Sequence, residues 1–367
     1  MAHDPLYPSL ITDALATVRY PGSGKNIVEL DMVADDIRID GDNVSFTINF
    51  SKPTDPFKAS LVKAAEAAIH LKAPHAKVTI NTASAAPAPA PKPPVLPGVK
   101  NIVAVSSGKG GVGKSTVAAN LAVALAAEGY KVGLLDADIF GPSMPKMFGL
   151  ENAELYMHEV NGVNLIIPAE QYGVKLLSIG FLIDTDKAAV WRGSMASNAL
   201  KQLIEQADWG ELDYFILDMP PGTSDIHLTL VQTLGITGAL VVTTPQQVAL
   251  ADARKGIAMF RDPKINVPVL GIVENMAWFT PEAHPEERYF LFGSEEAVDA
   301  LAEQYKVPVL ARIPLVAAVG EHSDKGVPVA LENTASAQAF VHLARETVDA
   351  IDRRNRELPP TLKVETH

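Results

Sequence analysis

Residues 108–115 read GKGGVGKS, and this stretch decides how the rest of the chain is interpreted. It matches the P-loop pattern G-x-x-x-x-G-K-[S/T], in which glycines allow backbone N–H groups to surround phosphate oxygens. An apolar run, Ile102–Ser106, precedes the loop, and an alanine- and leucine-rich segment, Thr116–Ala127, follows it. This order of strand, glycine loop and helix places phosphates at the positive end of a helix dipole. The sequence therefore predicts a nucleotide site, and a purely structural glycine turn is the alternative.

The chemistry of a P-loop assigns roles to individual residues. Lys114 is expected to reach the β- and γ-phosphates of ATP, and the Ser115 hydroxyl is expected to ligate Mg²⁺. These two roles predict an ATPase that depends on Mg²⁺. Contacts with the nucleotide are expected along the whole loop, at Gly108, Lys109, Gly110, Gly111, Val112, Gly113, Lys114, Ser115 and Thr116.

Acidic residues follow two further strand-like runs. Asp218 ends the run that begins at Tyr214, as expected of the carboxylate that holds Mg²⁺ through water. Asp136 and Asp138 follow Leu134 and Leu135; we expect Asp138 to position or activate the attacking water and Asp136 to lie nearer the metal. Carboxyl ends of parallel strands meet at one edge of an open sheet, which favours a shared site. For either acid alone, a helix cap or a solvated loop residue is the alternative.

The segment PPGT at residues 220–223 follows Asp218 closely. Its glycine, Gly222, is expected to offer its N–H to the γ-phosphate.

Short apolar runs alternate with helix-length segments after residue 98. Such runs, separated by helices, indicate a mostly parallel sheet covered on both faces, so the predicted class is α/β, a doubly wound P-loop NTPase fold. The expected strands are Ile102–Ser106, Lys131–Leu135, Tyr214–Leu217, Ala239–Thr243, Val269–Val273 and Val309–Ile313.

An alanine- and proline-rich tract, ASAAPAPAPKPPVLP at residues 83–97, divides the chain. Alternating proline favours extended polyproline II, a semi-rigid spacer, and a long surface loop within one domain is the alternative. The residues before it predict a small α+β unit with helices at Pro8–Val18 and Phe57–Leu71, a hairpin of Ile37–Ile39 with Val44–Phe50, and a strand at Lys77–Ile80. We therefore expect a small domain at 1–82, a linker at 83–98, an ATPase domain at 99–351 and a loose polar tail at 352–367.

Composition limits the partners and the chemistry. The formal net charge of −12 repels phosphate backbones, so a nucleic-acid partner is not expected. The chain has no stretch of eighteen apolar residues and no secretory signal layout, which predicts a cytoplasmic protein without a membrane partner. It also has no cysteine, which excludes disulfides, thiolate catalysis and cysteine-bound metal clusters on this polypeptide alone.

The loop carries a second lysine, Lys109, ahead of the usual one. Residues 109–116, KGGVGKST, resemble the deviant Walker A motif of the MinD/ParA/nitrogenase-iron-protein group. In that group the extra lysine reaches across a dimer interface to the partner's nucleotide. The resemblance implies a catalytic role for Lys109 and an ATP-linked homodimer, whereas a surface charge is the alternative.

Within that group, the chain resembles the Mrp/ApbC iron–sulfur cluster carrier ATPases over nearly its whole length, and residues 1–82 resemble the small iron–sulfur assembly domain often fused ahead of them. The resemblance implies an ATPase that delivers iron–sulfur clusters to apoproteins and works with client or scaffold proteins. It also implies that Asn275 contacts the adenine and that Asp225 lies beyond switch II. The matching segments are Asp136–Ser143, Trp191–Gly193, Leu217–Asp225, Thr244–Ala249, Glu274–Met276, Ile313–Leu315, Asn26–Leu30 and Met32–Val33.

The chain departs from this family where the cluster is expected. Family members commonly carry C-x-x-C after the Glu-Asn-Met segment, but residues 278–289 read WFTPEAHPEERY here. The small domain lacks the usual cysteine near residues 54–56, and YPG stands at residues 20–22 where Asp-Pro-Glu is common. Cluster ligands are therefore expected to come at least partly from partners. His284, Glu282, Glu286 and Glu287 are expected to form a solvated acidic loop, and a site for a hard or borderline metal is the alternative.

Two other classes of function remain open. One is a nucleotide-gated adaptor or a spatial organiser of the MinD/ParA type that carries no cluster; the tail Arg353–Pro360, which has two prolines and no apolar stripe, disfavours a membrane-binding helix. The other is a small-molecule kinase, in which Trp191 and Arg192 approach an acceptor; a structural or switch contact is the alternative for Arg192.

Overall fold

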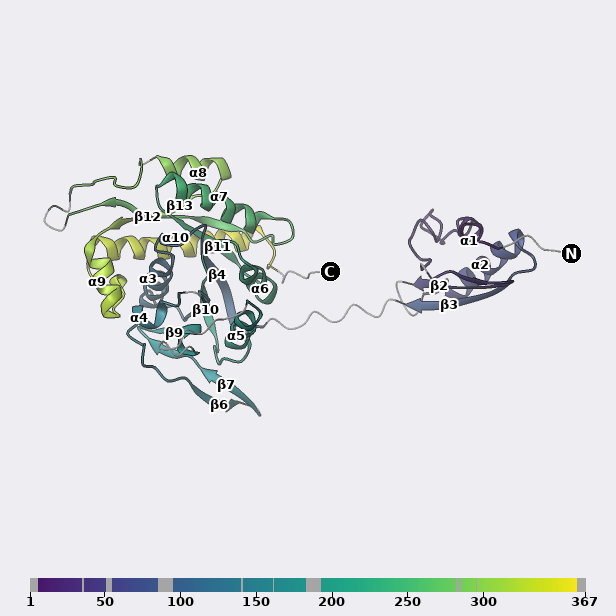
Figure 1. The fold of residues 1–367 in the computed structure, drawn as a ribbon, viewed down its shortest axis with the longest axis horizontal. Coiled ribbons are helices and arrows are strands. Elements are labelled where there is room, and N and C mark those ends of the chain that lie inside the picture. The colour runs from purple at the N-terminus through teal and green to yellow at the C-terminus, as the bar shows by residue number, and fades with distance from the viewer. Residues whose placement is uncertain are drawn as a thin grey trace. The chain divides into compact units, whose positions relative to one another are not determined.

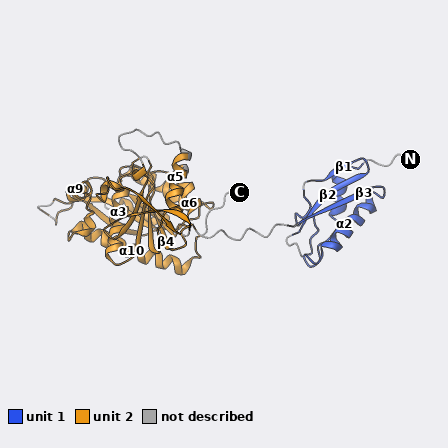
Figure 2. Cartoon of the chain, turned by 90° about the horizontal axis from the view of Figure 1, so that it is seen from below, with its two compact units in different colours: residues 1–93 blue, residues 94–367 orange. Residues whose placement is uncertain are grey.

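The chain divides into two compact units, residues 1–93 and 94–367, which are coloured separately in Figure 2. The computed structural model describes residues 6–34, 36–50, 55–84, 95–139, 141–160, 162–182, 193–281, 284, 286–294 and 296–361.

The smaller unit is a three-stranded sheet with two helices, α1 (Pro8–Leu15) and α2 (Lys58–Lys72) (Figure 1). Strand β2 (Asn43–Phe50) lies in the centre, antiparallel to β1 (Arg38–Asp40) and parallel to β3 (Lys77–Ser84). Alternate residues of β2, from Val44 to Phe50, are buried in one core cluster with residues of both helices. Period-two burial of this kind is what the alternating sequence predicted, and the predicted hairpin and helices are confirmed.

Strand β3 is longer than the sequence indicated. It continues through Ala83 and Ser84, which pair with Asn49 and Phe50 of β2, so the strand enters the stretch predicted as linker. Small residues do not stop a strand whose backbone has a partner to pair with. Composition alone does not reveal this pairing.

The larger unit is built on an eight-stranded sheet with the order β13-β12-β11-β4-β10-β5-β9-β8. Neighbouring strands are parallel except the β8–β9 pair, and the predicted α/β doubly wound class is confirmed. The strands are β4 (Val99–Ser107), β5 (Val132–Asp136), β8 (Ala169–Gln171), β9 (Val174–Ser178), β10 (Leu212–Asp218), β11 (Gly238–Thr243), β12 (Val269–Phe279) and β13 (Val309–Leu315). A separate antiparallel hairpin is formed by β6 (Tyr156–Val160) and β7 (Val163–Ile167).

Two layers of helices cover the sheet (Figure 1). On β4, Val103 and Val105 belong to a core cluster with α3 and α10, whereas Ala104 belongs to a cluster with α5 and α6. A third cluster joins β11 and β12 to α7 and α8. The helices of this unit are α3 (Lys114–Ala127), α4 (Met144–Met147), α5 (Gly193–Glu205), α6 (Asp225–Thr233), α7 (Gln247–Arg261), α8 (Ala297–Tyr305), α9 (Ala317–Lys325) and α10 (Ala335–Glu357), with short 3₁₀ turns at Ile179–Leu182 and Val329–Leu331.

The order of the strands places a crevice beside β4. The chain leaves β4 toward β5, and later passes from β10 to β11 on the opposite side of β4. Open α/β sheets bind ligands at such a reversal, outside the carboxyl ends of the strands. The P-loop follows β4 directly, so it lies at this point.

The C-terminal helix α10 continues to Glu357, so the prediction of a loose tail from residue 352 is wrong for residues 352–361. Ile351 and Arg354 extend the buried face of the helix past the predicted end. The Arg354 guanidinium donates to the Pro359 carbonyl and to the Thr361 hydroxyl, each at 2.7 Å, and fastens the chain that follows.

Within the described residues, no helix combines the length and the apolar character needed to cross a membrane.

The two units are expected to unfold separately. Phe46 is fully buried in the smaller unit, and Phe46→Ala should cost about 3–5 kcal/mol there because a large cavity replaces the ring. The three tryptophans, Trp191, Trp209 and Trp278, all belong to the larger unit. Denaturant unfolding followed by tryptophan fluorescence should therefore keep its wild-type midpoint, while circular dichroism reports the loss in the smaller unit.

Phe260→Ala, the matched variant in the core of α7, should instead lower the tryptophan midpoint. A Phe46→Ala variant that shifts the tryptophan transition would show that the units are energetically coupled.

Candidate nucleotide-binding and hydrolysis site

The glycine loop turns tightly between β4 and α3. Gly111 and Gly113 adopt φ of 80° and 79°, a left-handed backbone that side chains rarely permit. Gly113 is the N-cap residue of α3, and Val112 between the two glycines is buried in the core under the loop. The loop is therefore anchored from below by one apolar side chain, while its backbone is free to face the crevice.

Two glycines also allow neighbouring elements to approach. A Cβ on Gly108 would lie 2.1 Å from the backbone of Asp252 in α7, and one on Gly113 would lie 2.2 Å from Nδ2 of Asn275 in β12. Both contacts are shorter than any real Cβ tolerates, so glycine is required at these positions.

Lys114 lies at the centre of the site, with its side chain only 6% exposed. Its ammonium donates to Asp218 Oδ1 at 2.6 Å and to Ser115 Oγ at 3.1 Å, and lies 3.6 Å from Asp138 Oδ2. The predicted phosphate-binding lysine, magnesium-binding residues and water-positioning acid are thus brought together by the fold. An ammonium held in this way is a preformed positive charge at the N-terminus of α3.

Asp218 is the innermost carboxylate of the group and is fully buried at the end of β10. Burial raises its pKa, and the Lys114 ammonium acts in the opposite direction. Its Oδ2 atom has no hydrogen-bond partner in the described part of the chain. A buried carboxylate oxygen without a donor needs a cation or a cation-bound water, so this residue fits the magnesium role that the sequence predicted.

Asp136 is placed differently from what its predicted role suggests. Its Oδ1 accepts the Asp138 N–H at 3.1 Å, while its Oδ2 accepts the N–H groups of Ser143 (3.1 Å) and Met144 (3.2 Å) and the Ser178 hydroxyl (2.9 Å). Burial raises its pKa to about 7, and repulsion from Asp218 adds to the shift. Both oxygens are therefore occupied in holding the loop that carries Asp138.

A cavity of about 240 Å³ opens over the P-loop. Asp138 contributes to its wall, whereas Asp136 and Asp218 lie beneath it. The lining consists of Ser107, Gly110, Gly111, Gly113, Lys114, Ser115, Thr116, Asp138, Ser143, Met147 and Pro221.

Gly222 and Asn275 are both committed to backbone contacts with the β4–loop segment. The Gly222 N–H donates to the Ser107 carbonyl at 2.9 Å, and the Asn275 amide donates to the Val112 carbonyl at 2.8 Å. The γ-phosphate contact of Gly222 and the adenine contact of Asn275 stay predictions. Lys109 is half-buried, and no described residue forms an ion pair with it.

Sequence reasoning missed three residues that shape the site. Ser143 and Ser178 help to hold Asp136, as described above. His227 is fully buried near the start of α6, and its Nδ1 accepts the Ser224 N–H at 3.1 Å. Burial lowers the pKa of His227 to about 4, so it is neutral at pH 7. The spacing S-x-x-H at 224–227 has the form of a capping box and was the available signal for His227.

Three residues of the acidic segment after β12 lie close together. Single ligand atoms of His284, Glu286 and Glu287 lie within 4.8 Å of one another, and all three residues are exposed. Glu282, Trp191 and Arg192 lie outside the described residues, as does the side chain of Asp225.

Comparison with known proteins places this geometry in a family. The family model described as NUBPL iron-transfer P-loop NTPase, of the ParA group, matches residues 98–348, and the model for iron–sulfur cluster assembly proteins matches residues 9–81. The chain belongs to the NUBPL iron-transfer P-loop NTPase family. The predicted family is confirmed.

Relatives and solved structures agree with this assignment. An iron–sulfur cluster carrier protein of Synechocystis sp. is 44% identical over 345 residues, covering 92% of this chain and 97% of the relative. The Escherichia coli K12 carrier is 50% identical over 260 residues, covering 70% of this chain and 68% of the relative. The Archaeoglobus fulgidus nucleotide-binding protein, solved with ADP, has 35% identity and a TM-score of 0.57, covering 74% of this chain and 96% of its own.

The raised pKa of Asp136 predicts a pH dependence of stability. Asp136 binds its proton more tightly in the folded chain than in the unfolded chain, so its contribution to the free energy of unfolding falls as pH rises from about 4 to about 7. Relative to Asp136→Asn, the wild type should lose on the order of 4 kcal/mol over this window. Urea unfolding of nucleotide-free protein, followed by tryptophan fluorescence, measures the difference.

Asp213→Asn is the control, because the pKa of Asp213 is lowered by folding, whereas the pKa of Asp136 is raised. Lys100 lowers the pKa of Asp213, so its stabilisation disappears only below the ordinary pKa, and the difference from wild type should stay flat from pH 5 to 7. A constant difference between wild type and Asp136→Asn over the same range would show that Asp136 is ionised in the folded protein.

Proposed function

We propose that the chain binds ATP together with Mg²⁺ and hydrolyses the γ-phosphate at the P-loop. The observation that carries this proposal is the Lys114 ammonium, held 2.6 Å from Asp218 at the N-terminus of α3, under a cavity lined by glycine backbone. Two similar solved structures support the choice of nucleotide. The A. fulgidus protein contains ADP, and a MinD from Pyrococcus horikoshii (25% identity, TM-score 0.50) contains Mg-ADP.

Each part of the site has a role in this reaction. The backbone N–H groups of residues 110–115 and the Lys114 ammonium bind and orient the β- and γ-phosphates. The Ser115 hydroxyl and Asp218 would hold Mg²⁺, which neutralises charge on the phosphate oxygens when bound. Asp138 accepts a hydrogen bond from the attacking water. Attack on the γ-phosphorus breaks its bond to the β–γ bridging oxygen and releases ADP and phosphate.

Asp136 has a supporting role in this scheme. Its carboxylate accepts hydrogen bonds from the N–H groups of Asp138, Ser143 and Met144 and from the Ser178 hydroxyl, so Asp136 fixes where Asp138 projects. Any effect of Asp136 on the metal acts through its charge on Asp218, the neighbour that raises its pKa. The sequence-based view of Asp136 as a residue near the metal is retained only in this indirect form.

Lys109 is proposed to act across a homodimer. Its position at the start of the loop, its partial exposure and the absence of an ion-pair partner among the described residues leave the ammonium available to a second nucleotide site. The resemblance of the motif KGGVGKST to the deviant Walker A supports ATP-linked dimerisation. In this proposal ATP closes the dimer and hydrolysis reopens it.

The cargo is proposed to be an iron–sulfur cluster that passes to apoproteins. The relatives named as iron–sulfur cluster carriers support this, as does the assembly-protein match of residues 9–81. Clusters require thiolate ligands, and this chain has no cysteine. Partner scaffold or client proteins therefore supply at least part of the coordination.

The absence of cysteine also favours a second candidate, a nucleotide-gated adaptor that carries no cluster. In this role the chain brings a scaffold and a client together and releases them on hydrolysis. The two candidates share the ATPase and differ only in whether iron and sulfide accompany the chain.

ATP hydrolysis by point variants tests the nucleotide site. Lys114→Ala should abolish turnover, and it should also destabilise the larger unit by about 3–5 kcal/mol because Asp218 loses its buried counter-charge. The double variant Lys114→Ala/Asp218→Asn should regain stability and stay inactive. Phosphate release and thermal melting measure the two effects.

Lys109→Ala should lower turnover and weaken dimerisation by ATP, measured by light scattering with a non-hydrolysable analogue. Lys100→Ala is the control, because Lys100 is an exposed lysine paired with Asp213 outside the site. Unchanged dimerisation and turnover in Lys109→Ala would exclude the role across the dimer.

Anaerobic reconstitution with iron and sulfide separates the carrier from the adaptor. The purified chain alone should retain no cluster absorbance after gel filtration, because it provides no thiolates, whereas a mixture with a cysteine-bearing scaffold and ATP should transfer clusters to an apoprotein. Loss of transfer in every combination would exclude the carrier role and leave the adaptor.

A further inference from the structure

Asn275, within β12, contacts the P-loop from below. Its Nδ2 donates to the Val112 carbonyl at 2.8 Å, and only the missing side chain of Gly113 makes room for it. In a trans peptide the carbonyl and the following N–H point in opposite directions. With the Val112 carbonyl turned toward Asn275, the N–H of Gly113 is turned away from it. Gly113 is also one of the residues that line the cavity.

The backbone around Asn275 is unusual for a strand. Met276 has φ of 53°, a left-handed conformation that costs a non-glycine residue of order 1 kcal/mol, so neighbouring contacts must hold it. The pairing of β12 with β13 also shifts register between Asn275 and Phe279. The strand bends immediately after the residue that holds the P-loop.

An ion pair on the opposite face of β12 fixes the strand just before this bend. Glu274 and Arg312 are direct partners in the β12–β13 pairing, and Arg312 Nε donates to Glu274 Oε2 at 2.8 Å. Glu274 is 1% exposed and Arg312 is 34% exposed. A carboxylate buried this deeply needs its cation, so the pair constrains β12 at residue 274.

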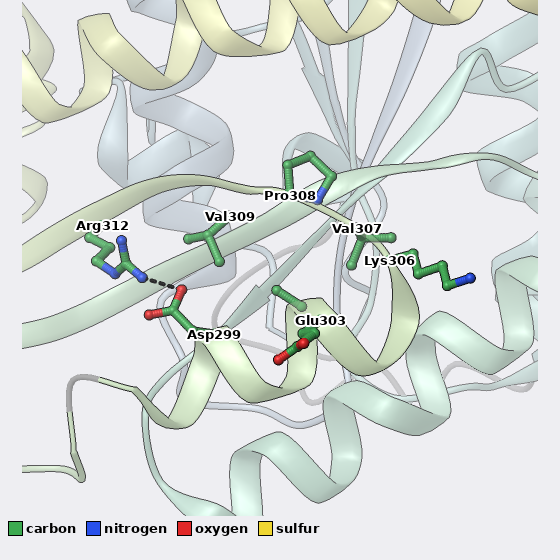
Figure 3. Close-up of a pocket in the computed structure, with 8 residues that line it drawn as sticks. Asp299, Glu303, Lys306, Val307, Pro308, Val309 and Arg312 are labelled. Atoms are coloured by element: carbon green, nitrogen blue, oxygen red, sulfur yellow. Dashed lines mark hydrogen bonds and ion pairs between the residues drawn. The ribbon is translucent and has the colours of Figure 1, made fainter.

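Arg312 reaches Glu274 from a surface groove between α8 and β13 (Figure 3). In that groove its guanidinium also donates to Asp299 of α8, while Lys306 lies at the far end of the groove from Arg312. The chain of contacts therefore runs from α8 through Arg312 to Glu274, and from the adjoining residue Asn275 to the phosphate loop.

We propose that Asn275 is a positioning residue that orients the Val112–Gly113 peptide for phosphate binding, and that the Glu274–Arg312 pair holds Asn275 in place. The consequence for nucleotide affinity rests on the proposed function. The consequence for the order of the P-loop concerns the nucleotide-free chain and stands independently of it.

The first test replaces Asn275 by leucine, which has a similar shape and cannot donate. Hydrogen exchange of the segment 108–115 in nucleotide-free protein should accelerate several-fold, and the dissociation constant for ATP should rise roughly tenfold, as expected for one lost hydrogen bond in a preorganised site. Thermal melting should show the variant folded at the temperature used. Unchanged exchange of residues 108–115 in folded Asn275→Leu would overturn the proposal.

The second test breaks and then removes the ion pair. Arg312→Met leaves the Glu274 charge buried and should raise the exchange rate of residues 108–115 and the ATP dissociation constant, by several-fold each. Adding Glu274→Gln removes that charge and should return the exchange rate and the dissociation constant toward their wild-type values. If Arg312→Met acted only by removing packing around the arginine side chain, the second substitution would restore neither value. Failure of the double variant to recover exchange would overturn the role of the pair.

Two groove variants serve as matched controls. Asp299→Asn removes only the exposed partner of Arg312, and Lys306→Met removes a charge that faces away from it, so both should match wild type. The variants could show the predicted exchange changes while the wild type binds no ATP. That result would contradict the proposed function and leave the role of Asn275 in the P-loop intact.

Discussion

The site depends on one buried ion pair, the Lys114 ammonium against the Asp218 carboxylate. Neither group can be buried alone at acceptable cost, so the sheet edge and the N-terminus of α3 must come together for both to be satisfied. The parallel sheet supplies the geometry, because β4 and β10 are neighbours and their carboxyl ends lie side by side. The remaining groups of the site are arranged around this contact.

Two sets of hydrogen bonds hold the P-loop and the segment that carries Asp138 in place around that ion pair. Asp136 gathers donors from residues 138, 143, 144 and 178, and so fixes the segment that carries Asp138. Asn275 fixes the loop from the opposite direction, through the Val112 carbonyl. Both are buried polar groups whose hydrogen bonds are made within the protein. Loss of these bonds would leave a buried polar group unpaired, which is costly in free energy.

Much of this organisation could be predicted from the sequence. The P-loop pattern, the acids after apolar runs and the alternation of short strands with helices are local signals, and each is confirmed as structure. The four strands β6 to β9 were not anticipated. Their segments are short and mixed in polarity, and β9 becomes a strand because β5 offers it a partner. Pairing with a distant strand is not visible in local periodicity.

The same limit applies to individual residues of the site. Asp136 follows a strand as Asp218 does, so the sequence pattern does not distinguish a carboxylate surrounded by donors from one with an oxygen left open. Asn275 was assigned to adenine by resemblance, and its contact with the P-loop joins residues 163 positions apart in the chain. Only the fold shows which buried group faces which neighbour.

Calorimetric titration of the wild-type chain with ATP and Mg²⁺ at pH 7 tests the central claim most directly. The account predicts saturable binding of one nucleotide per chain that disappears in Lys114→Ala/Asp218→Asn, a variant expected to remain folded. Absence of binding heat and of any thermal stabilisation by millimolar Mg-ATP in the wild type would contradict it.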